Sequence, residues 1–193
     1  MHYFYTYNYM KSMRKLEIEE LGRMNSGQYR LSAKLPLTVV LDDVRSLYNV
    51  GSVFRTSDSF RVERIILCGI TATPDNCLAE IHKTALGAEE TVEWSYEANC
   101  TDAVNKLIVS GYIIAAVEQV KESIRLENFR VQENTKYAIV FGNEVKGVSQ
   151  NVVDLCNLAI EIPQFGTKHS LNVSVTAGIV IWEIARQMMD RLT

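Results

Sequence analysis

The sequence is poor in cysteine and proline, and these shortages exclude several classes of protein. It has four cysteines and three prolines in 193 residues. The cysteines form no C-x-x-C pair and show no zinc-site spacing, so we predict no metal site. We expect them to be small buried side chains in a reducing compartment. They are Cys68, Cys77, Cys100 and Cys156.

Long apolar runs are also missing. No run approaches the roughly 18 apolar residues that a membrane-spanning helix needs. The segment Met1–Met10 carries tyrosines and polar groups and lacks the apolar centre of a signal peptide. We therefore predict a cytoplasmic protein without membrane contact. With 47% apolar and 22% charged residues, the composition is that of a globular protein with a substantial core.

Positive charge is scarce except near the amino terminus. The whole chain has a formal net charge of −3, which argues mildly against a nucleic-acid partner. Residues 1–35, however, contain six basic and three acidic side chains, and the remainder carries a net charge of −6. We therefore predict a short basic extension over 1–35, either a binding arm or a solvated leader, and one domain over 36–193. Met13 is an alternative start, because the residues before it show no structural pattern.

Apolar, β-branched segments alternate with amphipathic segments along the predicted domain. This alternation predicts an α/β fold with a mainly parallel sheet flanked by helices. We expect Asn49 to cap the first helix and Ser149 to cap a later one. The predicted strands are 37–41, 65–70, 91–96, 112–117, 137–141 and 158–162. The predicted helices begin after Asn49 and cover 76–86, 101–110, 150–156 and 173–192.

The last predicted helix is apolar on two flanks. Its main stripe has helical spacing, and Ile179 and Trp182 extend it to a second side. A helix with two apolar sides is usually covered by more than one partner. We expect a second subunit to be one of them.

Three loops that follow predicted strands carry unusual sequences. They are D-D-V-R-S-L-Y-N-V-G-S-V-F-R-T-S (42–57), F-G-N-E-V-K-G-V-S (141–149) and I-P-Q-F-G-T-K-H-S-L-N-V-S-V (162–175). Ligands of parallel sheets bind beyond the carboxyl ends of the strands, where these loops lie. Gly142, Gly147 and Gly166 either allow a flat ligand to approach the backbone or are ordinary turn residues.

Several side chains in these loops have both a structural and a functional interpretation. Arg55 is either a phosphate ligand or a solvated helix residue. Glu144 either anchors a substrate or belongs to a turn, and Ser170 and Asn172 are either site residues or helix caps. His169 is a weak candidate for a general base. The chain has no dinucleotide fingerprint, phosphate-binding loop, nucleophile elbow or metalloprotease motif, so these residues alone do not name a reaction.

Taken together and in order, the three loops resemble the three motifs of the SpoU (TrmH-like) branch of SPOUT methyltransferases. The matching segments are N-V-G-S-V-F-R-T, F-G-N-E-x-x-G and I-P-x-x-G-x-x-x-S-L-N-V-S-V. The resemblance spans residues 37 to about 190. Val145 departs from the pattern, because the family often has glycine there.

The resemblance implies an α/β fold whose carboxyl-terminal part forms a deep trefoil knot. It also implies a homodimer with the site at the subunit interface and S-adenosylmethionine bound in the knot. The positions that match cofactor-binding residues are Glu118, Gln119, Gly142, Ile162 and Leu171. The positions that match the catalytic centre are Asn49, Arg55, Glu144, Ser170 and Asn172.

The implied reaction is the transfer of a methyl group to a ribose 2′-hydroxyl of tRNA or rRNA, without a metal. A guanidinium is a poor base, so we expect Arg55 to hold the neighbouring phosphate. Phosphate contacts are expected from the basic extension and from Arg45, Arg61, Lys146 and Lys168. Two alternatives remain: a non-catalytic RNA-binding or assembly protein with the same fold, and a methyltransferase acting on a small molecule or protein.

Overall fold

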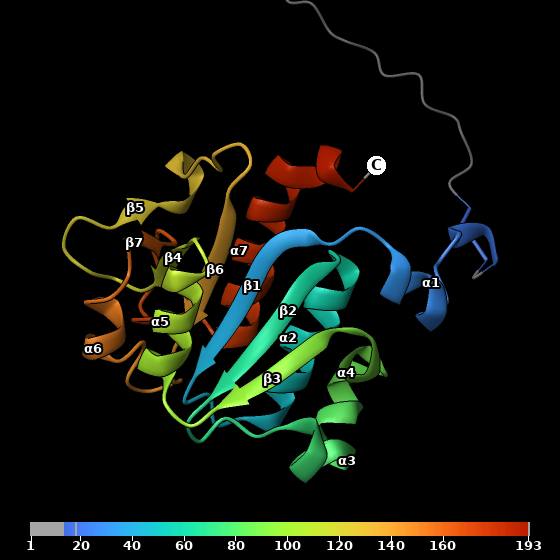
Figure 1. Ribbon diagram of the computed structural model, residues 1–193, viewed down its shortest axis with the longest axis horizontal. Helices are drawn as coiled ribbons and strands as arrows, with labels where there is room; N and C mark the ends of the chain where they lie inside the picture. Colours follow the sequence, from blue (N-terminus) through green and yellow to red (C-terminus); the bar gives the residue numbers. More distant parts are fainter. Residues whose placement is uncertain (1–13, 18, 193) are drawn as a thin grey trace, which may run out of the picture. The chain divides into compact units, whose positions relative to one another are not determined.

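The computed structural model describes residues 14–17 and 19–192 (Figure 1). The chain divides into two units, residues 1–31 and Ser32–Thr193. In the first unit, η1 (Glu19–Leu21) precedes α1 (Ser26–Leu31). The predicted uncommitted start, residues 1–12, lies outside the described residues. At α1, Asn25 and Gln28 exchange backbone-to-side-chain hydrogen bonds of 3.0 and 2.9 Å, which is the geometry of a capping box.

The second unit is built on a parallel sheet, which confirms the predicted α/β fold with a mainly parallel sheet flanked by helices. Within residues 32–192 the strand order is β3-β2-β1-β6-β4-β7-β5, and every adjacent pair is parallel. The central strands are largely buried because helices cover both faces, which explains their nearly continuous apolar sequences. The strands are β1 (Leu35–Asp42), β2 (Val62–Cys68), β3 (Glu93–Glu97), β4 (Tyr112–Val117), β5 (Ile124–Arg125), β6 (Lys136–Phe141) and β7 (Leu158–Glu161).

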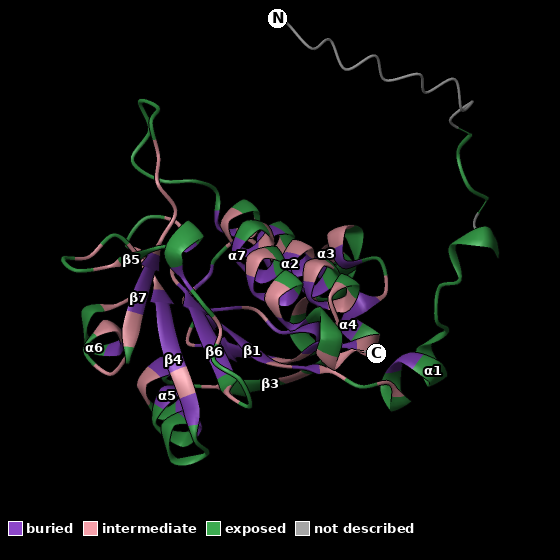
Figure 2. Cartoon of the chain, turned by 90° about the horizontal axis from the view of Figure 1, so that it is seen from above, coloured by how far each residue is buried: buried purple, intermediate pink, exposed green. Residues whose placement is uncertain are grey.

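Helices form a layer on each face of the sheet (Figure 2). One layer contains α2 (Leu47–Ser59), α3 (Pro74–Ala85), α4 (Ala88–Thr91) and α7 (Val173–Met188). The other contains α5 (Cys100–Val109) and α6 (Gln150–Val153). Two 3-10 turns, η2 (Leu126–Asn128) and η3 (Met189–Arg191), complete the described elements.

Some element ends differ from the sequence-based expectations. Asn49 does not cap α2, because Ser46 takes that position and its hydroxyl accepts from the Asn49 backbone N–H at 3.4 Å. The helix predicted over 150–156 stops after Val153, and the last helix continues beyond Met188 only as a 3-10 turn. Strand β5 was not predicted, since two residues carry no periodic signal.

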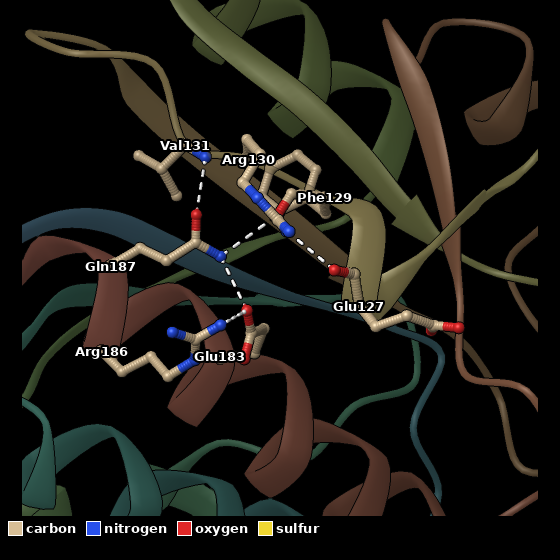
Figure 3. A network of polar contacts seen from close by, with 7 residues as sticks. All are labelled: Glu127, Phe129, Arg130, Val131, Glu183, Arg186 and Gln187. Carbon is tan, nitrogen blue, oxygen red and sulfur yellow. Dashed lines mark hydrogen bonds and ion pairs between the residues drawn. The ribbon is translucent and has the colours of Figure 1, made fainter.

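The carboxyl-terminal half of α7 is fixed to the segment between η2 and β6 (Figure 3). The Gln187 side chain accepts from Val131 N at 3.0 Å and donates to Phe129 O at 3.2 Å. Glu183 accepts from Gln187 at 2.8 Å and forms an ion pair with Arg186 at 2.6 Å. These bonds hold the carboxyl-terminal end of α7 in place. They thereby also set the position of its amino-terminal turn, which lies at the candidate site.

Candidate functional site

A cavity of about 540 Å³ lies beyond the carboxyl ends of β4, β6 and β7. Its wall is formed by the ends of these strands, the loops that follow them and the first turn of α7. Ligand sites of open parallel sheets are found at this edge. Eight of the ten predicted site residues line the cavity: Glu118, Gln119, Gly142, Glu144, Ile162, Ser170, Leu171 and Asn172.

Glu144 is held by three hydrogen bonds from the loop and helix that follow β1. Its carboxylate accepts from Arg45 N at 3.0 Å, Ser46 N at 2.9 Å and Asn49 Nδ2 at 3.0 Å. Burial acts to raise the pKa of Glu144, but these bonds outweigh it and hold the pKa below its ordinary value. The charged carboxylate therefore acts as an anchor between two loops and is a poor proton acceptor.

Asn49 and Asn172 extend this contact to α7. The Asn172 side-chain amide donates to Asn49 Oδ1 at 3.1 Å, while its oxygen accepts from Ser174 N at 2.9 Å and Val175 N at 3.3 Å. Asn172 is thus the N-cap of α7 as well as a lining residue. The helix-cap interpretation of Asn172 is therefore confirmed, while its role as a site residue stays a prediction. The resulting Glu144–Asn49–Asn172 chain brings all three sequence motifs to one place.

Glu118 and Gln119 connect the other side of the cavity. Glu118 accepts from Val148 N at 3.0 Å and from Gln119 N at 2.8 Å. The Gln119 amide donates to the backbone oxygen of His169 at 2.8 Å. These bonds join the loop after β4 to the loops after β6 and β7. His169 takes part through its backbone oxygen. Its imidazole ring has no hydrogen-bond partner among the described residues.

Two glycines are required by the loop after β6. A Cβ on Gly142 would lie 2.1 Å from the Gly147 carbonyl carbon, and Gly147 has a φ of +70°. The loop closes through a bridge between Asn143 and Gly147, with hydrogen bonds of 3.0 and 2.9 Å. Val145, the departure from the family pattern, is 81% exposed. Its side chain therefore does not interfere with this packing.

Sequence reasoning did not find Asp42. This residue is 5% exposed and accepts from both Ser149 N at 3.0 Å and Ser149 Oγ at 2.7 Å. It fixes the start of α6 to the end of β1. The only signal was an acidic residue at the end of a buried strand. Asn143 beside it donates to Asp43 O at 2.7 Å.

Arg55 and Asn49 are the two predicted site residues that do not line the main cavity. Asn49 contacts it through Glu144 and Asn172, as described above. Arg55 instead lines a second cavity of about 420 Å³ on the outer side of α2 and α3. A single chain therefore does not bring Arg55 together with the other predicted catalytic residues.

Within 14–17 and 19–192, no group of three or more His, Cys, Asp and Glu side chains is arranged to hold a metal ion. Among the described helices, none is both long and apolar enough to cross a membrane.

A parallel α/β fold with a polar pocket beyond its strand ends, framed by three loops, defines a ligand-binding protein of the α/β class. The profile of the SpoU rRNA Methylase family matches residues 36–182. The chain belongs to this family.

Curated relatives agree with this assignment. The chain is 32% identical over 157 residues to the 23S rRNA (guanosine-2′-O-)-methyltransferase RlmB of Neisseria meningitidis, covering 79% of this chain and 59% of that protein. It is 30% identical over 150 residues to an uncharacterized tRNA/rRNA methyltransferase of Borreliella burgdorferi, covering 78% and 64%. The chain thus spans about three fifths of the length of these relatives.

Solved structures share the fold. The A. aeolicus TrmH/SpoU tRNA modifying enzyme superposes with a TM-score of 0.74 at 27% identity, covering 86% of this chain and 83% of that one. An AdoMet-bound rRNA methyltransferase from Sinorhizobium meliloti gives a TM-score of 0.72 at 24% identity, covering 82% and 58%. The second likeness concerns the fold alone.

Proposed function

We propose that this chain is an S-adenosylmethionine-dependent RNA methyltransferase that modifies a ribose 2′-hydroxyl of tRNA or rRNA. The observation that carries the proposal is the Glu144–Asn49–Asn172 chain at the wall of the main cavity. It joins the three motifs by which the sequence resembles the family. The relatives named above supply the substrate class.

The main cavity fits the proposed cofactor. Its volume of about 540 Å³ is in the range of small-molecule sites, roughly 300–1,000 Å³. Ile162 and Leu171 supply apolar surface for an adenine ring, and the backbone at Gly142 supplies polar groups. Glu118 and Gln119 border the same space. S-adenosylmethionine supplies an activated methyl group, so the chain needs to position reactants rather than create a nucleophile with a metal.

The residues of the chain divide the work of positioning. Glu144 and Asn49 hold the loop after β6 against the start of α2, and Asn172 fixes the first turn of α7. Ser170 offers a hydroxyl at the pocket rim for the ribose. Keeping two reacting groups in line at a fixed distance lowers the entropic part of the barrier. We assign no proton transfer to Glu144, because its lowered pKa makes it a weak base.

We further propose that the protein is a homodimer in which Arg55 of one chain serves the cavity of the other. Arg55 is separate from the main cavity within one chain. On α7, Val175, Ile179 and Trp182 are 51%, 38% and 47% exposed. Their spacing puts them along one side of the helix, where a second subunit would cover them.

The domain division and the knot remain part of the proposal. We assign residues 1–35 to a short basic extension and 36–193 to the methyltransferase domain, with its carboxyl-terminal part threaded as a trefoil knot. Family membership supports the knot. Stretching one molecule from its ends tests it, because a tightened knot leaves the chain shorter than about 3.6 Å per residue; full extension would contradict the knot.

The first experiment is calorimetric titration with S-adenosylmethionine and its demethylated product. We expect about one equivalent per chain for the wild type and for Arg55→Ala, and weaker binding for Asn172→Ala. Asn105→Ala is the matched control, since Asn105 is exposed on α5 on the other side of the sheet. Transfer of labelled methyl groups to total RNA, lost on treatment with ribonuclease, completes the test.

Two outcomes would contradict the proposed function. A folded protein that does not bind S-adenosylmethionine would favour a non-catalytic RNA-binding role. A protein that binds it but transfers methyl groups only to protein or small molecules would show a different substrate class.

Unchanged activity in excess chelator is expected, because we assign no metal to the reaction.

A further inference from the structure

The second cavity, of about 420 Å³, lies on the α2–α3 face and is separate from the main cavity. Its α2 wall follows a helical spacing along one side of that helix, and its α3 wall is the last turn of α3. The lining residues are Ser52, Arg55, Thr56, Ser59, Phe60, Lys83 and Thr84.

The packing of two helices fixes the shape of this cavity. A Cβ on Gly51 would lie 2.2 Å from Thr84 Oγ1 and 2.3 Å from Ile81 O, so the approach of α3 depends on a glycine at this position. The Thr84 hydroxyl donates to Tyr48 O at 3.0 Å, which ties the end of α3 to the first turn of α2. The crossing brings Lys83 to the same hollow as Arg55.

The cavity carries positive charge that the described residues do not neutralise. Arg55 and Lys83 are exposed, and neither side chain forms a hydrogen bond or ion pair with a described residue. Among the described lining residues there is no carboxylate. The nearby Asp58 accepts from Thr91 Oγ1 at 2.7 Å.

Two serine hydroxyl groups that line the cavity are not available to donate to an anion. Ser52 and Ser59 donate their protons to backbone oxygens of the same helix, at 2.7 and 2.9 Å. Their donors are therefore already used. The attraction for an anion comes from the guanidinium of Arg55 and the ammonium of Lys83, which are the groups that bind phosphates in nucleic-acid complexes.

We propose that Lys83 acts with Arg55 to bind one phosphodiester of the RNA substrate on the α2–α3 face. This inference rests on the proposed function and adds a binding residue to it. The Arg55 guanidinium fits two phosphate oxygens at once, and Lys83 adds a compact charge from the neighbouring helix. The close crossing at Gly51 keeps the two helices that carry these side chains next to each other.

The salt dependence of RNA binding tests this directly. Binding of a fluorescently labelled, mixed-sequence 20-nucleotide single-stranded RNA is measured by anisotropy between 50 and 200 mM NaCl. Each phosphate contact to single-stranded RNA contributes about 0.7 to the slope of log affinity against log salt. We expect Lys83→Ala to lower the magnitude of this slope by about 0.7. The ratio of wild-type to variant affinity should therefore fall about threefold between 50 and 200 mM NaCl.

Matched variants separate a phosphate contact from a structural effect. Lys83→Arg should keep the slope, and Arg55→Ala should lower it by a similar amount. Lys106→Ala removes the same charge from α5, where Lys106 pairs with Glu97 at 2.6 Å, and should leave the slope unchanged. Cofactor titration and thermal unfolding of each variant report on folding.

The possible outcomes distinguish this inference from the proposed function. If Lys83→Ala shows the same salt slope of RNA binding as the wild type, the inference is overturned, even when cofactor binding and methyl transfer are normal. Failure of the wild type to bind this RNA at 50 mM NaCl overturns it as well. Loss of cofactor binding in the wild type would instead contradict the proposed function, while a reduced slope in Lys83→Ala would still support the phosphate site.

Discussion

At the residue scale, three polar side chains of the site, those of Glu144, Asn49 and Asn172, are engaged in hydrogen bonds within the protein. Glu144 accepts from three donors, and Asn172 uses both its amide and its oxygen. Such polar networks fix one arrangement of the loops, and the loss of a member leaves its partners without a hydrogen bond. The residues that the family pattern makes prominent therefore act first as structural ties between loops.

We expect Glu144→Gln to destabilise the fold in a pH-dependent manner. The pKa of Glu144 lies below its ordinary value of 4.5 in the folded state, so its contribution is present above about pH 4.5 and is lost as pH falls through the folded pKa. At neutral pH the variant should lose roughly 1–3 kcal/mol of unfolding free energy. Denaturant unfolding measured between pH 3 and pH 7 reports the difference.

The control for this prediction is Glu133→Gln, because Glu133 is exposed in the turn before β6. It should not change the unfolding free energy at any pH in this range. A Glu144→Gln deficit that stayed constant, or grew, as the pH was lowered would mean that the hydrogen bonds do not favour the charged carboxylate.

At this scale, the sequence predicted those residues that belong to a recognisable motif in a loop. The strand pattern pointed to the loops, because ligand sites lie beyond strand ends, and the family resemblance named eight residues that line the main cavity. Sequence reasoning assigned the α2 cap to Asn49 instead of Ser46, because both are good capping residues and only the helix start decides between them. It missed Asp42, whose partner Ser149 is 107 positions away in the sequence.

At the element scale, α2 is the part of the fold on which both cavities depend. Its first turn carries Asn49, its outer side carries Arg55, and its middle contacts α3 at Gly51. The strands that place it were predictable, because buried parallel strands have continuous apolar sequences. The short elements α4 and β5 were not, because their existence depends on contacts with neighbouring elements.

Gly51→Ala should disturb the crossing of α2 and α3. The new methyl group would lie 2.3 Å from the backbone oxygen of Ile81, so α3 must move. Overpacking of this kind costs about 1–3 kcal/mol. We expect a lower unfolding free energy and weaker RNA binding, with cofactor affinity retained, because the crossing is separate from the main cavity.

Gly178→Ala is the matched control, since Gly178 is also helical and a Cβ there would meet no atom within 4 Å. Its unfolding free energy should stay the same or rise slightly, because alanine favours a helix. If Gly51→Ala were as stable as Gly178→Ala, the helices would not need the close approach, and the shape of the second cavity would have another cause.

At the scale of the whole molecule, the separation of Arg55 from the main cavity needs an explanation. The family resemblance grouped Arg55 with the other catalytic candidates. Within one chain, however, Arg55 lines the second cavity. Nothing in one sequence specifies which residues meet across a subunit interface. A two-fold symmetric dimer would resolve the discrepancy, because each chain would lend its Arg55 to the cavity of the other.

Mixing two inactive variants tests this arrangement. In a heterodimer of Arg55→Ala with Asn172→Ala, one site would combine an intact cavity with an intact Arg55, whereas the other would lack both. Random exchange of subunits makes about half of the dimers mixed, so about a quarter of wild-type methyl transfer should return. Each variant alone should stay inactive. If Arg55 instead served the cavity of its own chain, every site in the mixture would lack one group, and activity would not return.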